Sequence, residues 1–152
     1  MKTVHRFLPG RELIVLTASG TLDLDATRGA IIMMTRDSAF DRSFEIVLDF
    51  RDVECALSVT DIYEIASFLG GPVSGLDTGR KIAVLIPDQM PFDNARFLEL
   101  CSANRGLRLG AFWDVARAER WLDADLPDDM QGAAPGPGND TSASAQGDNG
   151  PA

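Results

Sequence analysis

The amino-acid sequence predicts an α/β fold: a single mixed, mostly parallel sheet of about five strands with four helices, in the order β-β-α-β-α-β-α-β-α. Residues 44–50 and 81–87 are nearly continuous apolar runs rich in β-branched side chains, which is typical of central strands covered on both faces. Segments with helical periodicity follow both runs. A helix between two neighbouring strands of one sheet forces them into a parallel, right-handed unit, so most of the sheet is expected to be parallel.

The chain is expected to open with a hairpin and a helix. Residues 3–8 and 12–19 have strand character, and the Pro9-Gly10 dipeptide between them suits a tight turn, which indicates an antiparallel pair. A helix should then run from Asp23 to about Arg36, because apolar residues recur there at helical spacing and acidic residues stand at its start, where the helix dipole favours them.

The clearest helix lies between the two apolar runs. Ser58 begins an S-x-x-D pattern, apolar residues follow at positions i, i+3, i+4 and i+7, and Gly70 ends the helix. The glycines of residues 70–75 come after this helix and before a strand. A phosphate-binding loop needs the opposite order, strand then loop then helix, so these glycines are interpreted as a helix stop and a loop.

The last third of the domain should contain a helix, a strand and a short helix. A helix is predicted over residues 91–105, ending at Gly106, and a strand over residues 107–112. Asp114 is a good N-cap for the closing helix, which carries apolar residues on one side up to Leu122.

The charge distribution divides the chain into a folded domain, residues 1–124, and a tail, residues 125–152. The sequence of 152 residues has 14 basic and 23 acidic side chains and a formal net charge of -9, and six of the acids lie in the last 30 positions. The tail is acidic and rich in glycine and proline, so we expect it to be disordered. A chain without excess positive charge lacks the phosphate attraction of a nucleic-acid binder, and a polyanionic membrane surface is equally disfavoured.

The residues that usually carry catalysis or metal binding are few. Cys55 and Cys101 are too far apart for a CxxC pair, and His5 is the single histidine, so neither a metal site nor a cofactor is expected. No apolar run approaches the roughly 20 residues of a membrane span, and we predict a soluble, cytoplasmic protein.

The most informative stretch is the junction between the predicted central strand and the clearest helix, residues 48–61. In open α/β sheets, ligands and partners commonly bind at the carboxyl ends of the strands, which is where this junction falls. Ser58 and Thr60 are hydroxyls beside the positive end of a helix dipole; they are either N-capping groups or phosphoacceptor and docking points. Asp49, near the end of an otherwise apolar strand, is expected to accept hydrogen bonds from the backbone of the loop that follows the strand.

At this junction the sequence resembles the STAS and SpoIIAA-like group, small bacterial domains related to anti-sigma factor antagonists. The resemblance covers about residues 3–122, is closer to the SpoIIAA-like branch, and rests on the opening β-β-α order, the strand segments 47–53 and 81–86, the helix segment 94–99, and Phe112 with residues 118–122. Antagonist members carry D-S-S-G at the junction, where a kinase-type anti-sigma factor phosphorylates a serine. The matching segment here, residues 57–60, keeps Ser58 in register but lacks the preceding Asp and the following Gly.

The first functional hypothesis is therefore a non-enzymatic bacterial regulatory or scaffold module that binds another protein. Its partner would contact the junction near residues 51–61. A second copy of the chain is one candidate for that partner. The candidate contact residues are Arg51, Asp52, Ser58, Thr60 and Asp61.

Two alternatives come from other functional classes. A small apolar molecule or lipid would bind in a pocket lined by Met33, Phe97 and Trp113. An enzyme would have to use Cys55 or Cys101 with His5, which is the weakest of the three hypotheses because no further catalytic grouping accompanies them.

Overall fold

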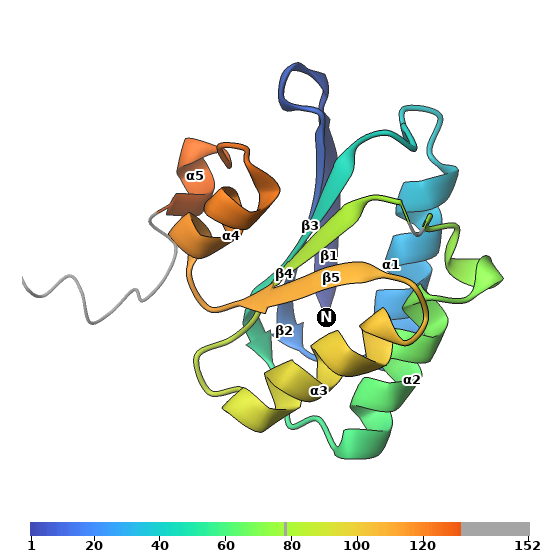
Figure 1. Ribbon diagram of the computed structural model, residues 1–152, viewed down its shortest axis with the longest axis vertical. Helices are drawn as coiled ribbons and strands as arrows, with labels where there is room; N and C mark the ends of the chain where they lie inside the picture. The colour runs from blue at the N-terminus through green and yellow to red at the C-terminus, as the bar shows by residue number, and fades with distance from the viewer. Residues whose placement is uncertain (78, 132–152) are drawn as a thin grey trace, which may run out of the picture.

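The computed structural model describes residues 1–77 and 79–131 and contains one five-stranded sheet (Figure 1). Its strands lie in chain order, β1-β2-β3-β4-β5, and only the β1–β2 pair is antiparallel. The strands are β1 (Lys2–Leu8), β2 (Leu13–Thr21), β3 (Glu45–Glu54), β4 (Lys81–Leu85) and β5 (Arg108–Phe112). The predicted fold class, a single mixed and mostly parallel sheet, is confirmed.

The hairpin between β1 and β2 turns where the sequence predicts. A short 3-10 turn, η1 (Pro9–Arg11), starts at the proline, and Glu12 closes it in the left-handed conformation, with φ of 55°. Leu8 then pairs with Leu13, and the two strands stay in register as far as Lys2 and Ser19.

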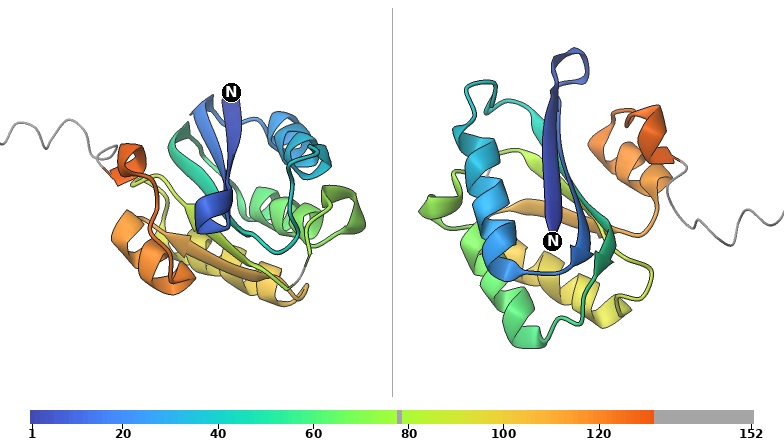
Figure 2. Two further views of the ribbon diagram at one scale, coloured as in Figure 1. Left: turned by 90° about the horizontal axis from the view of Figure 1, so that it is seen from above. Right: turned by 180° about the vertical axis from the view of Figure 1, so that it is seen from behind.

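Helices cover both faces of the sheet (Figure 2). One face carries α1 (Leu24–Arg36), α2 (Val59–Leu69) and α3 (Phe92–Ala103); the other carries α4 (Val115–Leu122) and α5 (Asp128–Gln131). A second short turn, η2 (Pro72–Ser74), follows α2.

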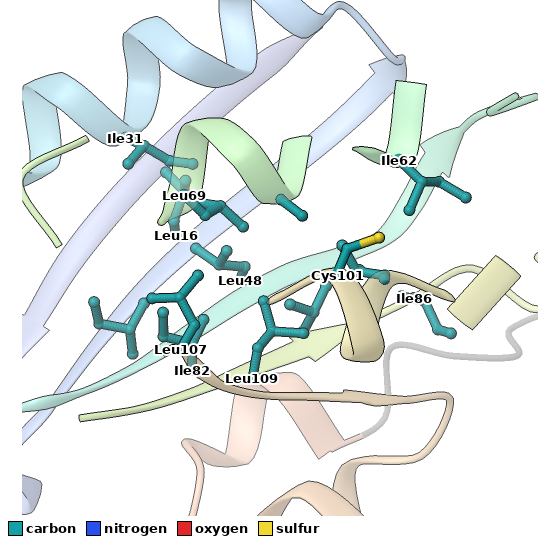
Figure 3. Packing of buried hydrophobic residues seen from close by; sticks show 14 of the residues in the cluster. Leu16, Ile31, Leu48, Ile62, Leu69, Ile82, Ile86, Cys101, Leu107 and Leu109 are labelled. Carbon is teal, nitrogen blue, oxygen red and sulfur yellow. The ribbon is translucent and has the colours of Figure 1, made fainter. Parts of the chain in front are cut away.

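Alternation along the strands produces two buried clusters, one for each face. In β2, Ile14 and Leu16 belong to the cluster beneath α1, α2 and α3, whereas Leu13 and Val15 belong to the cluster beneath α4 and α5. The larger cluster is shown in Figure 3, where side chains of α1, α2 and the central strands meet. A strand buried on both faces needs a continuous apolar run, which explains the sequence pattern.

The domain extends beyond the predicted boundary at residue 124. Leu126 and Met130 are 1% and 3% exposed and pack against the α4 side of the sheet, and Met130 belongs to the additional helix α5. The backbone N–H of Leu126 donates to the Glu119 carboxylate at 2.7 Å, which holds the segment after α4 against that helix. The boundary prediction was wrong because it followed charge and overlooked two apolar residues at helical spacing. The rest of the predicted tail, residues 132–152, lies outside the described residues.

Candidate functional site

The candidate site lies at the carboxyl ends of β3 and β4, where the strands have unequal lengths. β4 pairs with β3 only from Ile46 to Asp49, whereas β3 continues to Glu54 beside β2. β3 also holds one residue more than β2 between the pairs Thr17–Asp49 and Ser19–Asp52, a bulge of the kind often found next to functional sites. The end of β3 therefore projects beyond its neighbour, and the segments after β3 and β4 fill the space beside it.

A buried ion pair stands at this projecting end, on the face covered by α4. The Arg51 guanidinium makes two hydrogen bonds to the Asp49 carboxylate, from Nε to Oδ1 at 2.9 Å and from Nη2 to Oδ2 at 2.8 Å. The side chains are 6% and 9% exposed, and the Asp49 hydrogen bonds are the main reason why the pKa of Arg51 is raised. Asp49 also accepts from the backbone N–H of Arg51 at 3.2 Å; this backbone contact lies within β3 and not in the loop after it, where it was predicted.

This pair removes Arg51 from the predicted contact residues. Its charge is already neutralised by Asp49, and its side chain turns to the face opposite α2. Sequence reasoning missed the pairing because it assigned Asp49 to the backbone alone, although the D-x-R spacing of alternate strand residues places both side chains on one face.

Ser58 and Asp61 form a reciprocal cap at the start of α2. Ser58 Oγ accepts from the backbone N–H of Asp61 at 3.1 Å, and the Asp61 carboxylate accepts from the backbone N–H and the hydroxyl of Ser58, both at 2.9 Å. The hydrogen bond from the Ser58 backbone, and after it the one from the Ser58 hydroxyl, lower the pKa of Asp61. The predicted N-cap is confirmed. A phosphate on Ser58 would break the capping box and meet the Asp61 carboxylate, so the geometry favours capping.

The surface around the cap combines acidic groups with two exposed apolar side chains. Asp52 and Thr60 are exposed, as a contact surface requires. Val59 and Tyr63, which were not among the predicted contact residues, are 60% and 52% exposed. The signal was present in the sequence: both stand one turn apart on α2 and outside the buried stripe of Ile62, Ala66 and Leu69.

Behind the junction lies a cavity of about 60 Å³ with a predominantly apolar wall. It is bounded by α1, α2, α3 and the ends of β3 and β4, and its wall includes Ile31, Leu48, Phe50, Ile65, Leu69 and Leu98. Figure 3 shows Ile31, Leu48 and Leu69 gathered there. The hydroxyl of Thr27 also borders it but donates to the backbone oxygen of Asp23 at 2.8 Å. The cavity interior therefore offers a ligand van der Waals contact and no free hydrogen-bonding side chain apart from the Cys55 thiol.

A surface depression lies directly outside this cavity, between the segment before α2 and the segment before α3. Cys55, Leu57 and Met90 border both the depression and the cavity, so they form the wall between them. Burial raises the pKa of the Cys55 thiol, which lowers its thiolate fraction. Across the depression, Asn94 Nδ2 donates to the backbone oxygen of Leu57 at 3.4 Å.

The three residues predicted to line a ligand pocket do not come together. Met33 is 68% exposed on α1, because the buried stripe of that helix runs through its neighbour Met34. Phe97 is half-buried against the larger core cluster, and Trp113 stacks on Phe92 with ring centroids 6.2 Å apart. None of the three borders the apolar cavity.

The remaining candidate catalytic groups are separately engaged. His5 Nε2 lies 3.2 Å from Asp37 Oδ2, and its ring contacts Phe7 edge-on. Cys101 is buried in the larger core cluster. Over residues 1–77 and 79–131, no group of three or more histidine, cysteine or acidic side chains could hold a metal ion. In the same residues, none of the helices has both the length and the apolar character needed to cross a membrane.

Neither the models of known protein families nor the curated proteins include a match to this chain.

Proposed function

We propose that this protein is a non-enzymatic regulatory or scaffold module that binds another protein through the start of α2. The contact surface, called the junction patch below, consists of Asp52, Ser58, Val59, Thr60 and Tyr63. The observation that carries the proposal is the exposure of Val59 and Tyr63, which stand one turn apart beside the sheet's carboxyl edge. Covering such side chains removes apolar surface from water, at about 25 cal/mol per Å².

The Tyr63 ring is already held in position for contact. The Arg105 guanidinium carbon lies 4.7 Å from the ring centroid, and Arg105 Nη2 donates to Ser67 Oγ at 2.7 Å. A side chain that is ordered before binding loses less conformational entropy on binding, and tyrosine is among the residues that dominate interface energies.

The charge around the patch indicates the chemistry of the partner. Asp52 and Glu54 are exposed at the end of β3, and Asp61 stands beside Ser58. A complementary partner carries an apolar centre surrounded by lysine or arginine, since opposite charges at the rim speed association and discriminate against wrong partners.

The experiment is affinity capture from an extract of the native host, with partners identified by mass spectrometry at low and high salt. Val59→Ser and Tyr63→Ser should each lose the principal captured protein, and high salt should weaken its capture by the wild type. The matched control is Met33→Ser, an equally exposed apolar residue on α1, which should retain it. Equal capture by all variants, or equal loss in the control, would assign the interaction to another surface.

The proposed family is the STAS and SpoIIAA-like group. It is supported by the opening hairpin, the closing strand–helix pair and the segment around Ser58. We place the protein in the cytoplasm, where free thiols such as those of Cys55 and Cys101 persist.

A second candidate function, binding of a small apolar molecule or lipid, is favoured by the apolar cavity. An apolar lining favours apolar guests over water. The cavity takes the place of the predicted pocket at Met33, Phe97 and Trp113. Xenon under pressure, followed by methyl chemical shifts in NMR spectra, tests whether a guest enters it.

A further inference from the structure

We infer that the apolar cavity opens to solvent between residues 55–58 and 89–94, and that it takes a short unbranched aliphatic chain with a neutral polar head. This inference rests on the second proposed function, and it specifies the opening and the chemical class of the ligand. Its basis is the shared wall between the cavity and the surface depression, together with the polar groups at the outer side of that wall.

The cavity and the depression share three lining residues. Cys55, Leu57 and Met90 face the cavity on one side and the depression on the other. Methionine is unbranched and has three rotatable bonds, so Met90 can move aside without displacing its backbone. An opening at this wall connects the cavity with solvent without breaking the sheet.

Leu57 and Met90, from the two sides of this opening, both pack against the larger core cluster, and one side-chain hydrogen bond joins the two sides. The bond from Asn94 to the Leu57 oxygen is long, at 3.4 Å, and therefore weak. The start of α3 has no side-chain cap, since its N-cap position is Pro91. The start of α2, in contrast, is closed by the capping box of Ser58 and Asp61. Movement is therefore expected on the side of residues 89–94.

The lining determines what can enter. A polar head inside the cavity would lose its hydrogen bonds to water, because the Thr27 hydroxyl is already engaged, the Cys55 thiol is a weak partner, and the other lining side chains are apolar. An aliphatic chain loses no hydrogen bonds there, and each buried methylene tightens binding by about fourfold. At rest the cavity volume of about 60 Å³ limits the chain, so longer chains need the Leu57–Met90 wall to open.

The depression determines the head group. Gln89 borders it and can exchange hydrogen bonds with a hydroxyl, and the side-chain oxygens of Ser58 and Asn94 border it and can accept one. The Asp61 carboxylate is 2.9 Å from the Ser58 hydroxyl, and Asp93 is exposed in the first turn of α3. These negative charges disfavour a carboxylate head, so an alcohol should bind better than the fatty acid of the same length.

The test is an NMR titration of the methyl-labelled full chain with 1-butanol, 1-hexanol and hexanoate at neutral pH. Methyl chemical shifts under xenon pressure are recorded first and show whether the cavity accepts a guest. The methyl groups of Ile31, Ile65 and Leu69 should shift, whereas those of Leu122 and Leu126, on the opposite face, should not. Hexanol should bind on the order of tenfold more tightly than butanol, because two more methylenes are buried. Hexanoate should bind on the order of tenfold more weakly than hexanol.

A pair of cysteine variants locates the opening. Cys55→Leu fills the shared wall and should abolish hexanol shifts, whereas Cys101→Leu, at a cysteine of the larger core cluster that does not border the cavity, should retain them. Thermal melts confirm that each variant is folded. The wild-type titration decides the inference even if a variant fails to fold.

The xenon, hexanol and hexanoate results separate this inference from the second proposed function. Shifts with xenon but none with hexanol would overturn this inference and leave the second function in place. The absence of shifts with both would overturn both. Equal binding of hexanoate and hexanol would overturn the assignment of the head group, and unchanged binding by Cys55→Leu would overturn the place of the opening.

Discussion

Replacing Asp49 by Ala should destabilise the protein more than removing any exposed ion pair. The substitution leaves the Arg51 guanidinium buried without its counter-charge, while both hydrogen bonds of the pair and the bond to the Arg51 backbone are lost. Breaking a buried pair in this way costs about 3–5 kcal/mol. The loss of a single neutral hydrogen bond, which leaves one partner unsatisfied, costs only about 1–3 kcal/mol, so the charge determines the size of the effect.

Urea unfolding monitored by circular dichroism measures this loss. The matched control is Asp25→Ala, which removes the partner of Arg28 in an ion pair whose aspartate side chain is 93% exposed. Exposed pairs contribute about 0–1 kcal/mol, so the control should remain close to the wild type. The double variant Asp49→Leu/Arg51→Met should recover most of the loss, because it leaves neither charge buried.

A loss of less than about 1 kcal/mol for Asp49→Ala would refute this reasoning, because that value is the one expected for a pair in contact with water. Destabilisation of the double variant equal to the sum of the single losses would also contradict it. In that case Asp49 and Arg51 would act independently and not as a pair.

Two further predictions concern the end of the folded domain and the start of α2. Leu126→Ala should lower the free energy of unfolding by about 2–5 kcal/mol, since it empties a buried site; the loss would be near zero in urea unfolding if the domain ended at residue 124. The Asp61 pKa lies below its ordinary value of 3.8 in the folded protein, so the carboxylate stabilises the fold fully above that pH and loses this effect as the pH falls through the lower folded value. The stability difference between wild type and Asp61→Asn should therefore shrink below about pH 4 in acid titrations, and a constant difference from pH 6 to pH 2 would contradict this.

Local patterns predicted most of the fold because each pattern contains the residues that produce the element, such as the cap that starts a helix. The S-x-x-D pattern at Ser58 is itself the capping box, and Asp114 accepts the backbone N–H groups of Ala116 and Arg117 as an N-cap should. The continuous apolar run at 44–50 reports burial on both faces, which only an inner strand of a doubly covered sheet has.

The site was less predictable because it depends on differences between elements that are distant in the chain. The cavity lies where β3 extends beyond the end of β4. The sequence of one strand does not predict how long its neighbour is. Met33 has a different explanation. The helical spacing of Ile31 and Met34 already indicated that Met34 faces the core, and the assignment of Met33 to a pocket disregarded that spacing.

The end of β3 separates a rigid part of the site from a deformable one. On the α4 face, the pair of Asp49 and Arg51 fixes the local conformation of the strand by three hydrogen bonds in a buried environment, and the strand stays paired with β2 as far as Glu54. On the other face, Leu57 packs against the larger core cluster and receives one long hydrogen bond from Asn94 across the depression. A guest that moves Leu57 would act next on Ser58 and the first turn of α2, which carries Val59. The strand end would stay in place, so occupation of the cavity should change the junction patch without disturbing the sheet.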